Sequence, residues 1–218
     1  LVPHPYSWDP SAGVCNLCSP IDVVFDDIEI INSAYQSASE LGSRLNLNLL
    51  SGTANEKNEK ASTSLKLKLQ DLSDESSYKI TITSDDVEIT AGDEAGFYYG
   101  LISLMQLAQT YHQLFPCGSI FDKPRFSWRG QHLDTVRHFY SVDSLLKLLD
   151  LMSLFKLNKF HWHGVDDEAF RFKLDRHPEI ATATAKRGNN LSVPPVFGSG
   201  PDATGGCYDR EDMQKVIN

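Results

Sequence analysis

Six side chains in the second half of the chain have types and spacing that could support chemistry. They are Asp134, Arg137, His161, His163, Asp166 and Asp167. A guanidinium offers a rigid fork of donors that holds adjacent hydroxyls or a carboxylate, while carboxylates accept hydrogen bonds from hydroxyl and amide N–H groups. Imidazoles beside carboxylates also bind zinc in some barrel hydrolases. The group therefore suits a polar ligand or a metal ion.

The surrounding pattern predicts a strand, a helix and a second strand that carry these residues. The sequence RGQHLD (129–134) reads as a short strand, and Ser141 is a good N-cap for the periodic apolar segment 142–158. The segment 159–165 is the next strand. A helical crossover of this length joins parallel strands, which makes the segment a βαβ unit.

Ligands of parallel βα folds bind at the carboxyl ends of the strands. Asp134 and Arg137 follow the first predicted strand, and Asp166 and Asp167 follow the second. Because neighbouring parallel strands end side by side, we expect Arg137 and the aspartate pair to face one pocket. A buried Arg–Asp pair that only pins the loops is the structural alternative.

The histidines leave a second chemistry open. His161 and His163 lie two apart on a strand and so share one face, which makes a metal-dependent hydrolase the alternative on chemistry alone. No third histidine follows at usable spacing, and we interpret the others as structural or solvated: His4, His112, His132, His138 and His177. Glu168 and Arg171 are expected to form a salt bridge at a strand edge.

Residues 1–122 are predicted to form a small α+β domain. Alternating apolar residues predict strands at 45–49, 65–69, 78–83 and 87–90, the last two forming an antiparallel hairpin, and helices are expected at 31–45 and 94–114. The polar segment 52–62 reads as a loop, and the prolines and glycine of 116–124 as a linker. Farther on, residues 170–174 alternate between apolar and polar types. Residues 185–207 read as a long Gly/Pro-rich loop, and Asp209 precedes a last helix.

Composition limits the classes of partner. The 218 residues carry 29 acidic and 20 basic side chains, a formal net charge of −9, without a Lys/Arg cluster, which argues against nucleic acid and anionic membranes as partners. No apolar run is long enough to span a bilayer, and no signal peptide is visible. Cys15 and Cys18 form a C-x-x-C without a second pair at zinc-finger spacing, so a structural role or a local disulfide is expected.

A long stretch resembles one enzyme family. RGQHLDTVRHFYSVDSLLKLLDLMSLFKLNKFHWHGVDDEAFRF (129–172) resembles the start of the catalytic barrel of the β-N-acetylhexosaminidases of glycoside hydrolase family 20, with Gly164 where the family pattern has leucine. GGCYDREDMQKVI (205–217) resembles the segment that opens a later helix. LVPHP and AGFYYGLISLMQL resemble the α+β domain that precedes that barrel. The resemblance implies an α/β fold in which 1–122 precede the first units of a (β/α)8 barrel over 123–218.

The same resemblance implies roles for single residues. Arg137 should bind the C3 and C4 hydroxyls of the terminal sugar, with Asp134 orienting it. Asp166 should belong to a buried Asp–His pair that supports catalysis, its histidine lying outside this chain. His163 and Asp167 match positions that build the pocket floor. No metal site and no cofactor are implied.

The implied reaction removes terminal β-linked N-acetylhexosamine with retention, the substrate's own acetamido oxygen attacking C1. The family supplies the catalytic Asp-Glu pair from a fourth strand, which we do not find here. We therefore expect a fragment, or one chain of a cleaved precursor, that is inactive alone and needs the rest of the barrel as partner. A secreted, periplasmic or lysosomal-type location fits such enzymes, and a sugar-binding homologue without the acid is a further alternative.

Overall fold

The computed structural model describes residues 1–17, 22–25, 29–47, 63–112, 114–191, 193–195 and 202–217. The fold is mixed α/β and divides into two compact units, Leu1–Ser127 and Trp128–Asn218. In the first unit the elements are β1 (Ser7–Asn16), β2 (Asp22–Phe25), α1 (Glu29–Arg44), β3 (Ser64–Leu69), β4 (Tyr78–Ile82), β5 (Asp86–Ala91), α2 (Glu94–Tyr111) and β6 (Leu114–Asp122). In the second they are β7 (Gly130–Asp134), α3 (Val142–Leu154), β8 (Lys159–His163), α4 (Pro178–Thr184), β9 (Lys186–Arg187), β10 (Thr204–Gly205) and α5 (Arg210–Ile217).

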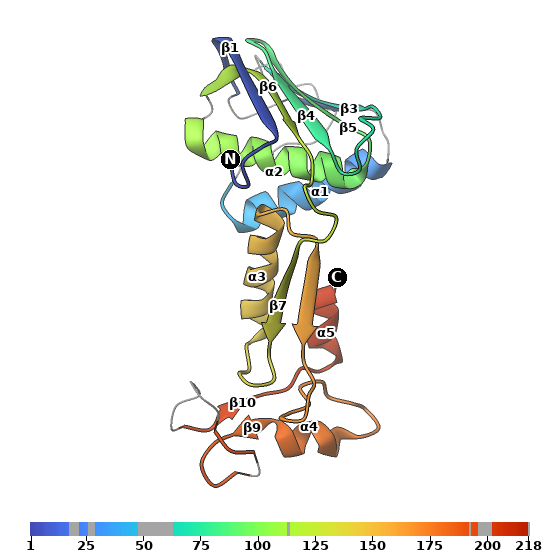
Figure 1. Ribbon diagram of the computed structural model, residues 1–218, viewed down its shortest axis with the longest axis vertical. Helices are drawn as coiled ribbons and strands as arrows, with labels where there is room; N and C mark the ends of the chain where they lie inside the picture. The colour runs from blue at the N-terminus through green and yellow to red at the C-terminus, as the bar shows by residue number, and fades with distance from the viewer. Residues whose placement is uncertain are drawn as a thin grey trace. The chain divides into compact units, whose positions relative to one another are not determined.

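The first unit is a six-stranded sheet with helices on one face (Figure 1). The strand order is β1-β6-β4-β5-β3-β2, antiparallel from β1 to β5 and parallel from β5 to β2. The predicted β4–β5 hairpin is confirmed. Helix α2 packs against the sheet at β4, β5 and β6, and α1 packs on α2. Gly100 permits the close approach, since a Cβ there would lie 2.7 Å from Ile89 Cγ2.

The apolar stripe of α2 forms the core of this unit, as its helical spacing predicts. Phe97, Leu101, Leu104 and Met105 are fully buried. Asp93 caps the helix by accepting a hydrogen bond from the Gly96 N–H at 2.7 Å. No helix among the described residues is long and apolar enough to cross a membrane.

Two predictions for the first unit are wrong. Residues 45–47 form a turn after α1, so the expected strand 45–49 is not present there, and its last two residues lie outside the described part, as does the predicted loop 52–62. The expected linker over 116–124 begins inside β6. Pro116 is tolerated because this part of β6 pairs with β1 alone, so the missing N–H costs at most one ladder hydrogen bond.

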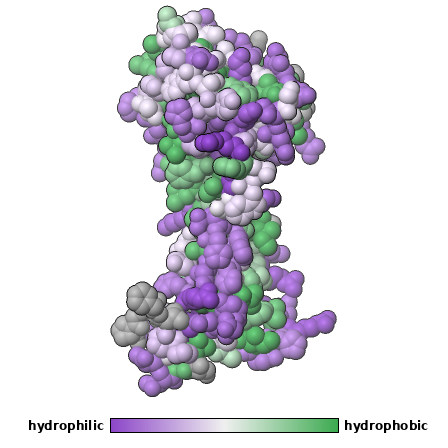
Figure 2. Space-filling view, in the orientation of Figure 1, coloured by the Kyte–Doolittle hydropathy of each residue, from purple (hydrophilic) through white to green (hydrophobic). Residues whose placement is uncertain are grey.

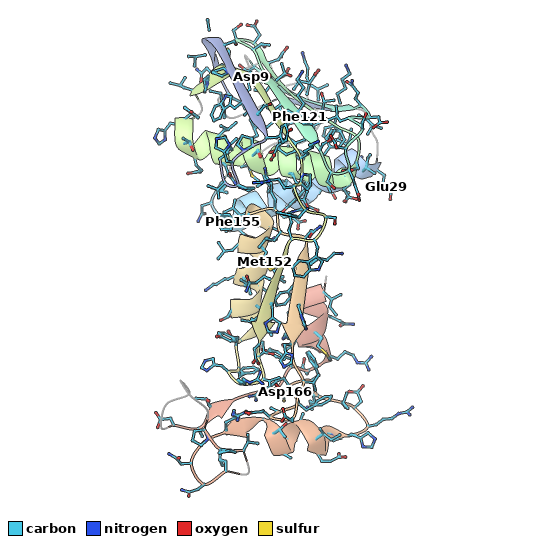
Figure 3. The ribbon with its side chains drawn as sticks, in the orientation of Figure 1. Asp9, Glu29, Phe121, Met152, Phe155 and Asp166 are labelled. Carbon is cyan, nitrogen blue, oxygen red and sulfur yellow. The ribbon has the colours of Figure 1, made fainter. Side chains whose placement is uncertain are left out.

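In the second unit, β7 and β8 are parallel, which confirms the predicted βαβ unit. Ser141 caps α3 and accepts a hydrogen bond from the Ser144 N–H, as expected. The helix ends at Leu154, four residues before its predicted end. Phe155, just after that end, is exposed, whereas Met152 is buried; Figure 3 labels both residues. A left-handed backbone at Lys156 (φ 59°) marks that end.

The later part of the second unit departs further from prediction. Residues 170–174 make isolated bridges instead of a strand. The segment 185–207 contains the antiparallel pair β9 and β10, and a short helix, α4, precedes it. Asp209 caps α5 by accepting a hydrogen bond from the Asp212 N–H at 2.9 Å, as predicted.

A buried hydrogen-bond network joins β4, α2 and β6. The Tyr78 hydroxyl lies 2.6 Å from Ser103 Oγ and donates to Asp122 Oδ2 at 2.9 Å, and all three residues are buried. Burial, followed by the Asp122 charge, raises the pKa of Tyr78 well above its usual range. The hydroxyl therefore stays protonated and satisfies a carboxylate inside the core.

Replacing Tyr78 by phenylalanine removes this donor and leaves the buried Asp122 carboxylate short of one partner. We expect the free energy of unfolding of the first unit to fall by about 1–3 kcal/mol, measured by urea unfolding. Tyr6→Phe is the matched control, because Tyr6 is exposed. Equal stability of the two variants would contradict the role given to the network.

Candidate active site at the ends of two parallel strands

The in-register pairing of β7 and β8 brings the predicted site residues together. Asp134 pairs with His163 and His132 with His161, so the carboxyl ends of both strands lie side by side. The Thr135 N–H and hydroxyl both donate to the His163 carbonyl, at 2.9 and 3.0 Å. These bonds hold the two chain ends together just where the functional side chains begin.

The Asp134 carboxylate holds both the backbone and the side chain of Arg137 in place. The Asp134 Oδ1 accepts from the Val136 N–H at 2.9 Å and the Arg137 N–H at 3.1 Å, while Oδ2 accepts from Arg137 Nη1 at 2.5 Å. The Arg137 side chain is 53% exposed. The bond to Asp134 thus orients the guanidinium through Nη1 and leaves it accessible to a ligand.

Asp166 lies beyond the carboxyl ends of β7 and β8 (Figure 3). Its Oδ2 lies 3.0 Å from His163 Nε2 and 3.4 Å from Arg137 Nη1, so it links the two strand ends. Its Oδ1 accepts from the Glu168 N–H at 2.7 Å. The structure therefore brings Asp134, Arg137, His163 and Asp166 into one chain of contacts. Asp167 is exposed, and its side chain makes no hydrogen bond or ion pair with the described residues.

Both aspartates are stabilised as carboxylates. Burial pushes the pKa of Asp134 upward, but the hydrogen bonds and charge of Arg137 and the Val136 N–H outweigh it, and the pKa falls below its usual value. Burial likewise opposes the ionisation of Asp166, yet His163, the backbone N–H groups and Arg137 hold its pKa below the usual range. The site thus presents two anions beside one accessible cation at neutral pH.

Arg171 organises the backbone around the site. It is fully buried. Its guanidinium donates to the carbonyls of Thr135 (3.0 Å), Val136 (2.5 Å), Ala185 (2.8 Å) and Gly206 (3.0 Å). Burial lowers its pKa, and no carboxylate pairs with it among the described residues. The predicted Glu168–Arg171 salt bridge is therefore wrong.

Glu168 instead pairs with Arg187, a buried residue whose Nε has no hydrogen-bond partner among the described residues.

The glycine at position 164, where the family pattern has leucine, has a steric reason. A Cβ at Gly164 would lie 2.3 Å from Phe172 Cζ, so the phenylalanine ring occupies the space that a side chain at 164 would need.

Three histidines share one face of the strand pair. Ligand atoms of His132, His161 and His163 all lie within 4.8 Å of one another. Sequence alone separates His132 from the other two by a whole helix, and only the register of β7 and β8 unites them. Trp162 points the other way and contacts Tyr208 and Phe172.

Comparison with known proteins identifies the family of this arrangement. The model of glycosyl hydrolase family 20, domain 2, matches residues 1–123, and that of the family 20 catalytic domain matches residues 126–218. The chain belongs to glycosyl hydrolase family 20. Members of this family thus resemble it over both compact units.

Curated relatives agree with the family. A β-hexosaminidase of Vibrio vulnificus is 30% identical over all of the chain and 25% of its own length, and the N,N'-diacetylchitobiase of Vibrio harveyi is 32% identical over 67% of the chain and 18% of its own length. The chain therefore spans about a quarter or less of these family 20 relatives.

Solved family 20 structures superpose on the whole chain. The exo-β-N-acetylglucosaminidase of Vibrio harveyi in complex with N-acetylglucosamine gives a TM-score of 0.82 at 28% identity, with 33% of that chain covered. The β-N-acetylhexosaminidase of Streptomyces coelicolor gives 0.76 at 27% identity, with 43% covered.

Replacing Arg171 by lysine removes the fork that binds several carbonyls at once. A charge-assisted hydrogen bond contributes about 1.5–3 kcal/mol, and the lost bonds leave buried carbonyls unpaired. We expect the second unit to lose at least about 3 kcal/mol of stability, measured by hydrogen exchange of the β7 and β8 amides. Arg176→Lys, at an exposed arginine, should exchange like the wild type. Unchanged protection in Arg171→Lys would refute the assigned role.

The lowered pKa of Asp134 predicts a pH-dependent contribution to stability. A carboxylate whose folded pKa lies below its unfolded value of about 3.9 stabilises the fold above that pH, and the contribution is lost as the pH falls through the folded pKa. The stability difference between wild type and Asp134→Asn should therefore be largest from pH 5 to 7 and shrink below about pH 4. The measurement is denaturant unfolding across pH. Asp202→Asn, at an exposed residue, should differ little from wild type throughout, and a constant Asp134→Asn deficit down to low pH would overturn the assignment.

Proposed function

We propose that the protein containing this chain is a glycoside hydrolase that removes terminal β-linked N-acetylhexosamine with retention of configuration. The relatives named β-hexosaminidase and N,N'-diacetylchitobiase support this substrate class. An N-acetylhexosamine-terminated oligosaccharide is then the ligand, with chitin fragments among the candidates. The reaction proceeds with no cofactor, and neither nucleic acid nor membrane is a partner.

One observation carries the proposal: Arg137 is oriented by two aspartates yet half exposed. Asp134 and Asp166 both contact its Nη1, and the side chain makes no other hydrogen bond or ion pair with the described residues, so its Nη2 and Nε remain available as donors. A fixed planar fork of donors suits two adjacent hydroxyls, such as O3 and O4 of a pyranose. The ordering of Arg137 before ligand binding lowers the entropy cost of association.

Asp166 acts as a positioning residue in this proposal. It ties Arg137 to His163 across the strand ends, and we assign it to the Asp–His pair that supports catalysis. His163 and Asp167 belong to the pocket floor. The substrate's acetamido oxygen attacks C1, a carboxylate polarises its N–H, and a neighbouring glutamic acid protonates the leaving oxygen. That Asp-Glu pair comes from a strand outside this chain.

This function also implies an architecture and a location. Residues 1–122 form an α+β domain, and 123–218 form the first part of a (β/α)8 barrel whose remainder is a partner of this chain. The parallel β7–β8 pair, with its ligand-type residues at the carboxyl ends, supports the barrel assignment. A secreted, periplasmic or lysosomal-type location is part of the same proposal.

The test is hydrolysis of a chromogenic N-acetylglucosaminide by the full-length protein. Arg137→Lys keeps the charge but loses the fork, so kcat/KM should fall at least about tenfold, mainly through KM. Asp166→Asn removes a charge-assisted contact, and turnover should fall roughly 10–100-fold. Arg176→Lys is the matched control.

Three results would go against the proposal. Absence of glycosidase activity in a folded full-length protein would favour the sugar-binding homologue. Activity that is lost with a chelator and restored by zinc would favour the metal-dependent hydrolase using His161 and His163. Wild-type kinetics in both Arg137→Lys and Asp166→Asn would leave the reaction standing but remove these residues from it.

A further inference from the structure

The β7–β8 pair carries a feature that the proposed glycosidase reaction does not use. His132 and His161 are cross-strand neighbours, and His163 lies two residues farther along the same face. Both His132 and His161 are exposed in this chain. In Figure 2 the face of β7 and β8 turned toward the viewer is coloured hydrophilic. Three imidazoles thus gather on a face where a parallel sheet ordinarily carries apolar residues.

Almost all ring nitrogens of this trio lack a hydrogen-bond partner among the described residues. Only His163 Nε2 makes a hydrogen bond to a described residue, to Asp166 Oδ2 at 3.0 Å. His132 and His161 contact each other edge to face, with ring centroids 4.7 Å apart, and make no side-chain hydrogen bond within the described part. The packing of the two rings explains why His132 and His161 touch, but it does not involve the ring nitrogens that could bind a ligand.

The geometry points to a binding site for one divalent transition-metal ion of the zinc, nickel or copper class, held by His132, His161 and His163. Since their ligand atoms lie within 4.8 Å of one another, a point exists within about 2.8 Å of all three, and zinc–nitrogen bonds measure about 2.0–2.1 Å. Inward movement of each nitrogen by less than about 1 Å would close the site, which small side-chain rotations can supply. Neutral imidazole suits these metals, whereas Mg²⁺ and Ca²⁺ require oxygen ligands.

Asp166 completes the arrangement as an outer partner. Histidines that ligate metals commonly donate their second ring N–H to a carboxylate, which fixes the tautomer and raises ligand basicity. The bond to Asp166 engages Nε2 of His163 and leaves its Nδ1 without a hydrogen-bond partner among the described residues. The Asp134 and Asp166 carboxylates offset the ion's charge, and Arg137 beside them opposes it. The site shares His163 with the proposed sugar pocket but needs no glycosidase chemistry.

Calorimetric titration of the chelator-treated full-length protein with Zn²⁺, and separately with Mg²⁺, tests this site. We expect one Zn²⁺ bound per chain with saturation and no binding of Mg²⁺. His132→Gln should weaken Zn²⁺ binding at least tenfold, and His161→Gln should do the same. Neither residue belongs to the proposed sugar-binding set, so folding and glycosidase activity of both variants serve as independent checks.

The matched control is His177→Gln, because His177 is an exposed histidine away from the trio that pairs with Glu179. Its variant should bind Zn²⁺ like the wild type. Absence of saturable Zn²⁺ binding would overturn the proposal, and so would wild-type affinity in both folded variants, His132→Gln and His161→Gln. Equal weakening by His177→Gln would also overturn it, since the bound ions would then be scattered over surface histidines.

Discussion

The second unit depends on one buried cation. Arg171 lies out of contact with solvent, its charge balanced by backbone carbonyl dipoles instead of a carboxylate. Burying a charge is costly unless its donors are satisfied, so the segments after β7, after α4 and before α5 must keep their carbonyls aimed at one guanidinium. The loops that carry the site residues are therefore held by Arg171, whose hydrogen bonds to the described residues all go to backbone carbonyls.

This arrangement separates stability from binding. The partly exposed Arg137–Asp134 pair makes a modest contribution to folding, which is present only while Asp134 is ionised. The main effect of the pair is to orient Arg137, because Asp134 accepts hydrogen bonds from both its backbone N–H and its guanidinium. Arg171 fixes the carbonyls of the two residues just before Arg137. A binding arginine can thus remain accessible and still be ordered.

Sequence reasoning succeeds where periodicity is long and fails where a contact is non-local. The βαβ unit follows from a thirteen-residue helix with a serine cap, and its parallel strands place Arg137 beside Asp166. The five residues 45–49 alternate between apolar and polar types, but so short an alternation does not establish a strand. Strands β1 and β6 are hard to predict for another reason, because they contain prolines and glycines that normally interrupt strands. The hydrogen-bond acceptors of Arg171 are backbone carbonyls, which every residue type has, so the sequence cannot indicate them. Cys15, by contrast, is a buried free thiol whose pKa burial raises to about 11, which fits the structural role predicted for it, whereas Cys18 lies outside the described residues.

The register of β7 and β8 connects fold to chemistry. Asn158 accepts from the Arg129 N–H and donates to its carbonyl at one end, and Thr135 binds the His163 carbonyl at the other. A slip by one residue would turn Trp162 toward the face of His132 and carry His161 and His163 to the opposite face. These end contacts act together with the five paired residues of the β7–β8 ladder to hold the register. The sugar-binding and metal-binding proposals therefore rest on the same two pinning contacts, and both require the pairing of Asp134 with His163.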